Sequence, residues 1–521
     1  MKEKIKIVKP FGLVRSFLWP IYSYELKKLV PMFCLFFLIS FSYNLLRNMK
    51  ISVVVTLKSS GAQVIPYLKI VGVLPVALFM TYIFTKLINK YTREQVFYLM
   101  LSGFLLYFLL FLLFLFPFQN YLELNKTADF LITYVFISEG FSGFISIVRH
   151  WNLSLFYILS EMWSAIVLSM LFWGFANEVT KVNEAKRFYA IFALGANASG
   201  IFIGFFINWL EKLNLFYISF YCFKYQWVFY QLLTIILIGL IIMLLFFILN
   251  NYILEKDIIV KKNIYKKDNV FSLKECFFYL RKSRYLAYIV IIVVSYNIIY
   301  NLADVLWTYK VNQVYNNSKD LNSYISRISL VTGIIATVAA FIISGNVIRR
   351  YGWTIAALIT PIIWFLTSIG FLSGLLLEDV FNVEVLYAFL GNPANYVLLM
   401  GAIQVCLGRG CKYTVFDETK EIVFIPLSKE NQRKSKAIVD GIASRFGKSG
   451  GSLIYIFLLM IFGEISFTIP YVAFLIFVSM FIWMFAVLKL GKLANKTIDL
   501  EYADKGVIFD DTKESLYKKN F

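Results

Sequence analysis

A few charged side chains lie inside the long apolar stretches of this sequence. Glu161 and Asp304 are acidic examples, Lys69 lies near the start of another stretch, and Arg47 and Lys50 lie at the outer end of the first one. A charge at the centre of a membrane helix costs about 2.5–3.5 kcal/mol on insertion scales, so such residues are candidates for function. Together they predict a polar cavity in which basic residues bind an anionic solute and acidic residues serve gating or coupling. The alternatives are a structural ion pair between helices for the acidic residues, and snorkelling to the interface for Arg47 and Lys50.

Two clusters of small residues, Gly195–Gly200 and Gly447–Ser452, lie at the starts of predicted helices. Close helix packing is the simplest explanation for both. The second cluster is similar to a phosphate-binding loop, but five residues separate Gly441 from Gly447 where that pattern requires four, and no strand precedes it. We therefore reject a hydrolytic nucleotide-binding loop. A helix N-terminus that carries Lys448 can still meet a phosphate group, which makes Lys448 a candidate binding residue.

The elements that must position these residues are membrane-spanning helices. The chain has 521 residues, of which 60% are hydrophobic and 16% charged, whereas globular domains carry about a quarter charged residues. Apolar runs of roughly 17–25 residues are long enough to span the hydrocarbon core. We predict an all-α integral membrane protein with about twelve transmembrane helices. The predicted spans are Leu29–Leu46, Pro66–Leu87, Val96–Phe118, Leu153–Phe175, Phe188–Leu210, Trp227–Leu249, Leu286–Trp307, Ile325–Val347, Thr354–Leu377, Val385–Leu407, Ile438–Phe462 and Phe467–Leu488.

The distribution of basic residues predicts the orientation. Lysine and arginine gather in the N-terminal arm, in the even-numbered connections and in the C-terminal tail, which the positive-inside rule assigns to the cytoplasm. This pattern also explains the net charge of +20 without nucleic-acid binding. The segment 128–148 is moderately apolar but carries Glu139, so we interpret it as external or re-entrant.

The longest basic loop separates six predicted spans from the next six. Two six-helix halves around a site at mid-membrane are the plan of the major facilitator type. The predicted organisation is a cytoplasmic N-terminal arm (1–28), an N-terminal half (29–250), a basic cytoplasmic central loop (251–284), a C-terminal half (285–488) and a cytoplasmic tail (489–521).

Composition argues against several other classes. The five cysteines show no Cys-x-x-Cys spacing and the chain has a single histidine, so we expect no disulfide framework, no metal site and no cofactor. The shortage of histidine and the absence of a clustered catalytic constellation disfavour a membrane enzyme, for example one acting on lipids. A passive channel or a structural membrane protein remains an alternative to a solute transporter.

Several long motifs are similar to those of one transporter family. They are Leu46–Lys50, Glu161–Trp163, Leu171–Asn177, Glu184–Tyr189, Gly195–Asn197, Phe416–Asp417, Lys420–Glu421, Ile425–Leu427, Lys434–Lys436 and Gly447–Gly451. On these residues the chain, from about Tyr24 to Lys492, resembles the ATP/ADP translocases of obligate intracellular bacteria and plastid envelopes.

The resemblance implies which residues bind or translocate the substrate. The family's first-span lysine falls on Lys50, its fourth-span glutamate on Glu161, its seventh-span acidic residue on Asp304 and a later lysine on Lys420. Secondary candidates are Arg47, Asn177, Lys186, Arg187 and Lys448.

Two departures from the family pattern bear on selectivity. Ile51 stands where the exchangers usually carry aspartate, and Asp304 stands where we expect glutamate.

The resemblance also implies the activity. We expect a monomeric nucleotide antiporter that imports host ATP in exchange for ADP across the bacterial inner membrane by alternating access, with phosphate moving alongside ADP. The alternative is a carrier of other nucleotides, such as GTP/GDP or pyrimidine nucleotides, with proton-coupled net import. In either case the partners are nucleotides and the lipid bilayer.

Overall fold

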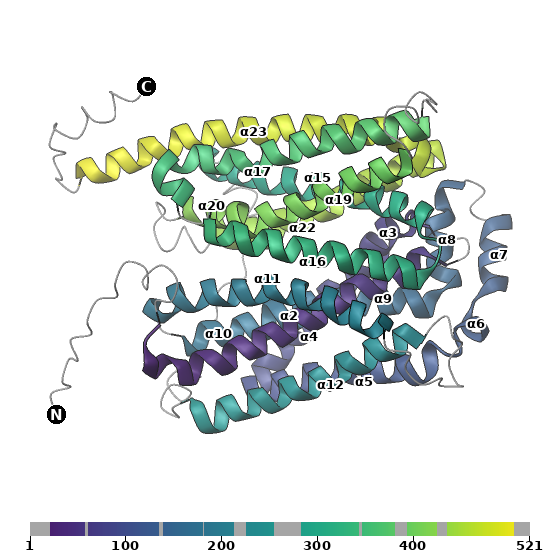
Figure 1. The fold of residues 1–521 in the computed structure, drawn as a ribbon, viewed down its shortest axis with the longest axis horizontal. Helices are drawn as coiled ribbons and strands as arrows, with labels where there is room; N and C mark the ends of the chain where they lie inside the picture. Colours follow the sequence, from purple (N-terminus) through teal and green to yellow (C-terminus); the bar gives the residue numbers. More distant parts are fainter. Residues whose placement is uncertain are drawn as a thin grey trace.

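The computed structural model is a bundle of long helices in two halves that lie side by side (Figure 1). It describes residues 21–57, 61–134, 139–180, 182–212, 226–254, 283–342, 346–380, 393–424 and 435–504. Helices α2 to α12 form the N-terminal half, and helices α15 to α23 form the C-terminal half. The face at which α2 begins and α23 ends is called the terminal face here, and the other end of the bundle the opposite face.

The N-terminal half contains six spans, several of which consist of consecutive α-helical and π-helical pieces. They are α2 (Leu26–Val55); α3 (Val64–Tyr67), η2 (Leu68–Val73) and α4 (Leu74–Lys90); α5 (Arg93–Leu110) and η3 (Phe111–Leu115); α9 (Trp151–Trp163), η5 (Ser164–Phe172) and α10 (Trp173–Val179); α11 (Val182–Lys212); and α12 (Gln226–Ile248) with η7 (Leu249–Ile253).

The C-terminal half repeats this plan in green to yellow helices (Figure 1). It comprises α15 (Arg284–Val314), α16 (Ser318–Ile342), α17 (Asn346–Leu375) with η8 (Leu376–Val380), α19 (Pro393–Cys411) with η9 (Lys412–Phe416) and α20 (Asp417–Ile422), η10 (Ala437–Ala443) with α22 (Ser444–Phe462), and α23 (Ile465–Asp504).

Within the described residues, eleven helices are long and apolar enough to cross a membrane. Each corresponds to one of the predicted spans. The remaining predicted span, Val385–Leu407, has no counterpart among these eleven helices. Residues 381–392 lie outside the described part, and α19 (Pro393–Cys411) covers the rest of this span. Polar residues lower the hydropathy of α19. One of them, Gln404, donates a hydrogen bond from its amide nitrogen to Ser368 of α17 at 2.6 Å.

The described part of the segment predicted to be external or re-entrant forms short helices at the opposite face. They are α7 (Asn125–Tyr134), η4 (Glu139–Phe141) and α8 (Ser142–Arg149), and α7 and α8 lie at the end of the bundle away from the termini (Figure 1). Gly140 approaches the C-terminal half so closely that a Cβ atom there would meet the Leu459 carbonyl oxygen at 2.3 Å.

The two halves also meet along α11 and α16. A Cβ on Gly333 of α16 would meet the Asn197 carbonyl oxygen of α11 at 2.7 Å, so the absence of a side chain permits the close crossing. The neighbouring α2 contributes a polar contact, because Asn48 donates a hydrogen bond to Ser326 at 3.1 Å and accepts one from Ser329 at 3.3 Å. The small-residue cluster Gly195–Gly200 therefore lies in a helix that packs against the other half.

The predicted arm, central loop and tail are only partly described. Residues 1–20, 255–282 and 505–521 lie outside the described part. At the C-terminal end, α23 continues as one helix past the predicted end of the last span to Asp504.

Candidate functional site

A charged cavity lies between the two halves. Its volume is about 270 Å³, slightly below the roughly 300–1,000 Å³ of ordinary ligand pockets. Seven basic and two acidic side chains line it, which leaves a formal excess of five positive charges, and five tyrosines complete the aromatic part. The charged lining residues are Arg47, Lys50, Lys69, Glu161, Asp304, Arg409, Lys412, Arg445 and Lys448, and the tyrosines are Tyr43, Tyr157, Tyr296, Tyr300 and Tyr413.

One ion pair in this central cavity belongs entirely to the N-terminal half. Lys50 of α2 is buried and forms an ion pair with Glu161 of α9. The Lys50 ammonium also lies 4.6 Å from the ring centroid of Tyr157, one turn before Glu161. The Glu161 side chain is 39% exposed against 4% for Lys50, so the carboxylate faces the cavity and the ammonium lies behind it. Two of the predicted residues are thus brought together.

A second ionic cluster joins the two halves. Asp304 of α15 lies 3.4 Å from Arg409 of α19 in its own half and 3.6 Å from Lys69 of η2 in the other half. The Lys69 ammonium donates a hydrogen bond to the Asn301 side-chain oxygen at 2.5 Å. Asn301 in turn donates to the Lys448 carbonyl oxygen of α22. The third predicted residue, Asp304, is therefore at the centre of a network across the interface.

Two secondary candidates also line the central cavity. Arg47 lies one turn before Lys50 on α2 and donates a hydrogen bond to the Tyr300 hydroxyl of α15 at 3.2 Å. Lys448 lies near the start of α22, where its side chain is exposed. Because helical repeat places Arg47 and Lys50 on the same face, the sequence spacing alone favours their joint presence in one cavity.

The other predicted residues lie outside this cavity. Lys420 of α20 forms an ion pair with Asp440 of η10 at 2.7 Å and is not among the residues that line the central cavity. Burial lowers the pKa of Lys420, but the carboxylates of Asp440 and Asp417 raise it more, and the net pKa is raised. Lys420 is therefore held as a cation near the terminal face.

The remaining secondary candidates lie at the ends of their helices that are near the terminal face. Asn177 accepts a hydrogen bond from the Tyr189 hydroxyl at 2.6 Å, and Arg187 forms an ion pair with Glu25. Lys186 lies near the start of α11, and its side chain is outside the described part.

Sequence reasoning missed three cationic residues of the central cavity. Arg409 and Lys412 follow the predicted span Val385–Leu407 in a basic connection, but α19 continues through η9 into α20 and carries both along the cavity wall. Arg445 lies near the start of the predicted span Ile438–Phe462 and lines the same cavity from α22. A helical repeat continuing past the apolar run was the signal that could have identified them.

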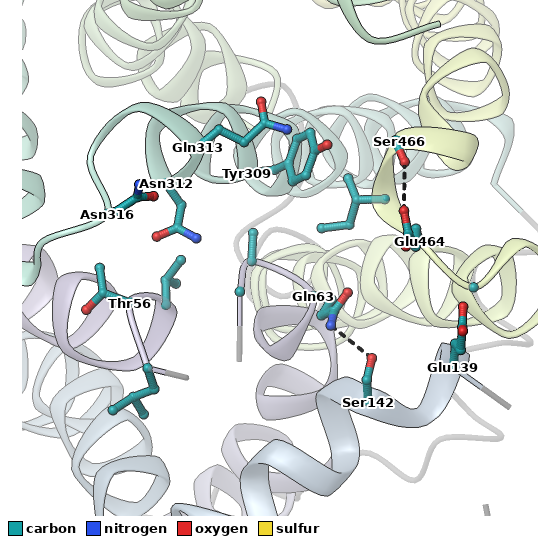
Figure 2. Close-up of a pocket in the computed structure, with 16 residues that line it drawn as sticks. Thr56, Gln63, Glu139, Ser142, Tyr309, Asn312, Gln313, Asn316, Glu464 and Ser466 are labelled. Atoms are coloured by element: carbon teal, nitrogen blue, oxygen red, sulfur yellow. Dashed lines mark hydrogen bonds between the residues drawn. The ribbon is translucent and has the colours of Figure 1, made fainter. Parts of the chain in front are cut away.

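A larger cavity of about 680 Å³ opens at the opposite face (Figure 2). Neutral polar residues such as Gln63, Asn312 and Gln313 line it together with Glu139 and Glu464, and none of the described residues around it is basic. Its electrostatic character is therefore opposite to that of the central cavity.

The second span shows which end of the interface is closed. All four residues of α3, near the opposite face, are buried, whereas α4, near the terminal face, contains no buried residue. At the opposite face α22 also packs tightly against the N-terminal half, where a Cβ atom on Gly140 would meet the Leu459 carbonyl oxygen at 2.3 Å. The halves are thus packed together at the opposite face and separated towards the terminal face, to which the central cavity opens.

Two helical halves that enclose a charged cavity, closed at one face and open at the other, define a secondary transporter rather than an enzyme. Comparisons with known proteins identify which kind. The chain belongs to the TLC ATP/ADP transporter family, which matches residues 5–493.

Curated relatives support this membership. The chain is 38% identical over 499 residues to ADP,ATP carrier protein 2 of Chlamydia pneumoniae, covering 93% of this chain and 92% of the relative. It is 33% identical over 495 residues to ADP,ATP carrier protein 1 of Rickettsia bellii, covering 93% and 97%. It is 35% identical over 482 residues to the chloroplastic ADP,ATP carrier protein 1 of Arabidopsis thaliana, covering 92% and 76%.

The fold is similar to a solved transporter structure. A bacterial homologue of the iron transporter ferroportin, in its inward-facing state, aligns with a TM-score of 0.53 at 13% identity, covering 92% of this chain and 100% of the other. At this identity the similarity concerns the fold, and it agrees with the major facilitator type predicted from the two groups of six spans.

Proposed function

We propose that this protein exchanges ATP for ADP across the bacterial inner membrane by alternating access. The observation that carries the proposal is the excess of five positive charges in a cavity built by both halves. A nucleoside triphosphate carries about four negative charges, which require preorganised lysine and arginine side chains. The names of the relatives, ADP,ATP carrier proteins of Chlamydia, Rickettsia and plastids, support the choice of nucleotides.

In this proposal, the phosphates bind between the halves. Arg47, Lys50 and Lys448 contact them, and the nucleoside extends towards the open terminal face, because the cavity alone is small for a whole nucleotide. Glu161 and Asp304 neutralise basic side chains while the site is empty, and the phosphates compete with these carboxylates for the same cations. The cavity tyrosines offer ring faces for the base.

The two faces have separate roles in the transport cycle. The terminal face is cytoplasmic, as the positive-inside distribution favours, and the described conformation is then the one that releases ATP and admits ADP. Lys420 and the terminal residues Asn177, Lys186 and Arg187 act along the path between the cytoplasm and the cavity. Phosphate accompanies ADP, and the functional unit is a monomer.

A second candidate function is transport of other nucleotides, such as GTP/GDP or pyrimidine nucleotides, with proton-coupled net import. The observation that favours it is Ile51, an apolar residue that lines the central cavity beside Lys50. An aspartate there would repel phosphate and restrict its position, so its absence relaxes the selectivity that the family pattern implies.

Uptake of labelled ATP into proteoliposomes separates these functions. Vesicles with and without internal ADP are compared, and unlabelled nucleotides and inorganic phosphate are added as competitors. Uptake that requires internal ADP and is blocked by ATP and ADP alone supports exchange. Uptake blocked by GTP or pyrimidine nucleotides, or uptake that a protonophore abolishes in vesicles without ADP, supports the second function and contradicts the first.

A further inference from the structure

Lys69 differs from the other cations of the central cavity in the location of its ionic partner. It belongs to the N-terminal half, but its neighbours Asp304 and Asn301 belong to the C-terminal half. Lys50 and Lys412 find carboxylates in their own halves, in Glu161 and in Asp417 at 3.4 Å. Separation of the halves therefore breaks the contacts of Lys69 and preserves the other two pairs.

The position of Lys69 connects the cavity to the closed face. Lys69 lies in η2, directly between the buried helix α3 and the exposed helix α4. Through Asn301, its ammonium is linked to Ser452 of α22, to which Asn301 donates a hydrogen bond at 3.0 Å. When the opposite face opens, the second span must move away from α15 and α22, so these contacts must break.

Separation of the halves in the empty carrier affects Asp304 and Lys69 differently. Asp304 keeps Arg409 of its own half at 3.4 Å when the halves separate, but Lys69 loses its carboxylate and its amide partner together. An ammonium left in a low-dielectric site without a partner is strongly unfavourable. The empty carrier therefore meets a barrier to reorientation that arises from one side chain.

We propose that Lys69 couples the two directions of transport by changing its anionic partner from Asp304 to a phosphate of the bound nucleotide. A phosphate in the cavity offers strong acceptor oxygens to an ammonium, so a loaded carrier can separate its halves without leaving Lys69 unpaired. Lys69 is thus a substrate-binding residue that makes reorientation depend on substrate. This inference rests on the proposed nucleotide exchange and adds the reason why the empty carrier does not reorient.

The first test compares two substitutions that remove one cavity cation each. The measured quantity is the rate of ATP uptake with internal ADP divided by the rate without it. For Lys69→Gln, we expect this ratio to fall by roughly tenfold or more, because a tenfold change in rate corresponds to only about 1.4 kcal/mol in the barrier. For the matched control Lys412→Gln, we expect a higher KM for ATP and an unchanged ratio. Lys69→Arg, which keeps the charge, should retain most of the dependence on internal ADP. An unchanged ratio in Lys69→Gln, or an equal fall in Lys412→Gln, overturns the proposal.

A second measurement does not depend on nucleotide transport. Ala62 lines the opposite-face cavity and is 2% exposed, so a cysteine at this position reports opening of that face. Labelling of Ala62→Cys with a maleimide is followed at this position by mass spectrometry in the absence of substrate. Compared with the protein that carries only Ala62→Cys, labelling should be at least several-fold faster when Lys69→Gln is added and unchanged when Lys412→Gln is added. With Lys69 intact, ADP should also accelerate labelling.

The transport and labelling experiments together distinguish failure of the proposed function from failure of the proposed role of Lys69. Wild-type protein that takes up no ATP or ADP contradicts the proposed function, while faster substrate-free labelling with Lys69→Gln still supports the role of Lys69 as the connection between the halves. Should that variant fold poorly, the effect of ADP on Ala62→Cys decides, because it uses native Lys69. Equal labelling with and without ADP, in a protein that transports ATP, contradicts the proposal.

Discussion

The two carboxylates of the central cavity are similar in chemistry but differ in what they connect. Glu161 pairs with Lys50, and both belong to the N-terminal half. Asp304 contacts Arg409 in its own half and Lys69 in the other half. When the halves move as rigid bodies, the first pair can persist through the cycle, whereas the second must be rearranged. Charge alone therefore does not determine a role in coupling, because the half in which the ionic partner lies matters as much.

The largest effect is expected for the pair within one half. Lys50→Ala removes a proposed phosphate contact and leaves the Glu161 carboxylate, which is 39% exposed, without its cation. A hydrogen bond to a charged group contributes about 1.5–3 kcal/mol. ATP uptake in proteoliposomes should fall by roughly a hundredfold or more, as a few kcal/mol in the barrier requires. Size-exclusion chromatography of the purified variant controls for folding. Uptake within a few-fold of wild type would remove Lys50 from the site.

A smaller effect is expected for the cluster between the halves. Asp304→Asn leaves Lys69 and Arg409 without a carboxylate. A phosphate of the bound nucleotide then supplies an anion in place of the lost carboxylate, so the substrate partly offsets the substitution. Uptake should fall by roughly tenfold, and ADP should raise the Tm of this variant by more than it raises the Tm of wild type. Asp304→Glu, which keeps the charge, is the matched control. An equal Tm increase in all three proteins contradicts this reading of the cluster.

The smallest effect is expected outside the cavity. Lys420→Ala breaks an ion pair with Asp440 near the terminal face, and partly exposed pairs contribute about 0.2–1 kcal/mol. Uptake should change by no more than about fivefold, mainly through KM at low ionic strength, because Lys420 acts on the approaching anion. Kinetics at two salt concentrations check this. A loss as large as that of Lys50→Ala contradicts the ranking and places Lys420 in the binding step.

The two cavities extend the comparison to the whole interface. The central cavity carries an excess of positive charge, whereas the described residues around the opposite-face cavity include two carboxylates and no basic side chain (Figure 2). A polyanion is therefore attracted to the middle of the protein rather than held at its closed end. The arrangement favours passage through the opposite face over retention there.

Sequence analysis predicted the helical architecture well because the cause is local. A span of apolar residues satisfies its own backbone hydrogen bonds wherever it lies in the bundle. The twelve predicted spans therefore include all eleven helices that are long and apolar enough to cross a membrane among the described residues. The span represented by α19 was predicted as well, although polar residues such as Gln404 and Arg409 lower its hydropathy. Both have partners on other helices, Ser368 of α17 and Asp304 of α15.

The residue types and their positions in apolar runs were enough to show that the charges of Lys50, Glu161 and Asp304 must be compensated, since burial of charge in a membrane helix is unfavourable in any fold. The partners of these charges follow from the packing of the helices. Helix rotation and spacing brought Arg409 to Asp304 and placed Lys420 beside Asp440 instead of in the cavity. Ionic contacts depend on distances of a few ångströms between segments far apart in the chain, so the division between pairs within one half and pairs across the interface is a property of the assembled bundle.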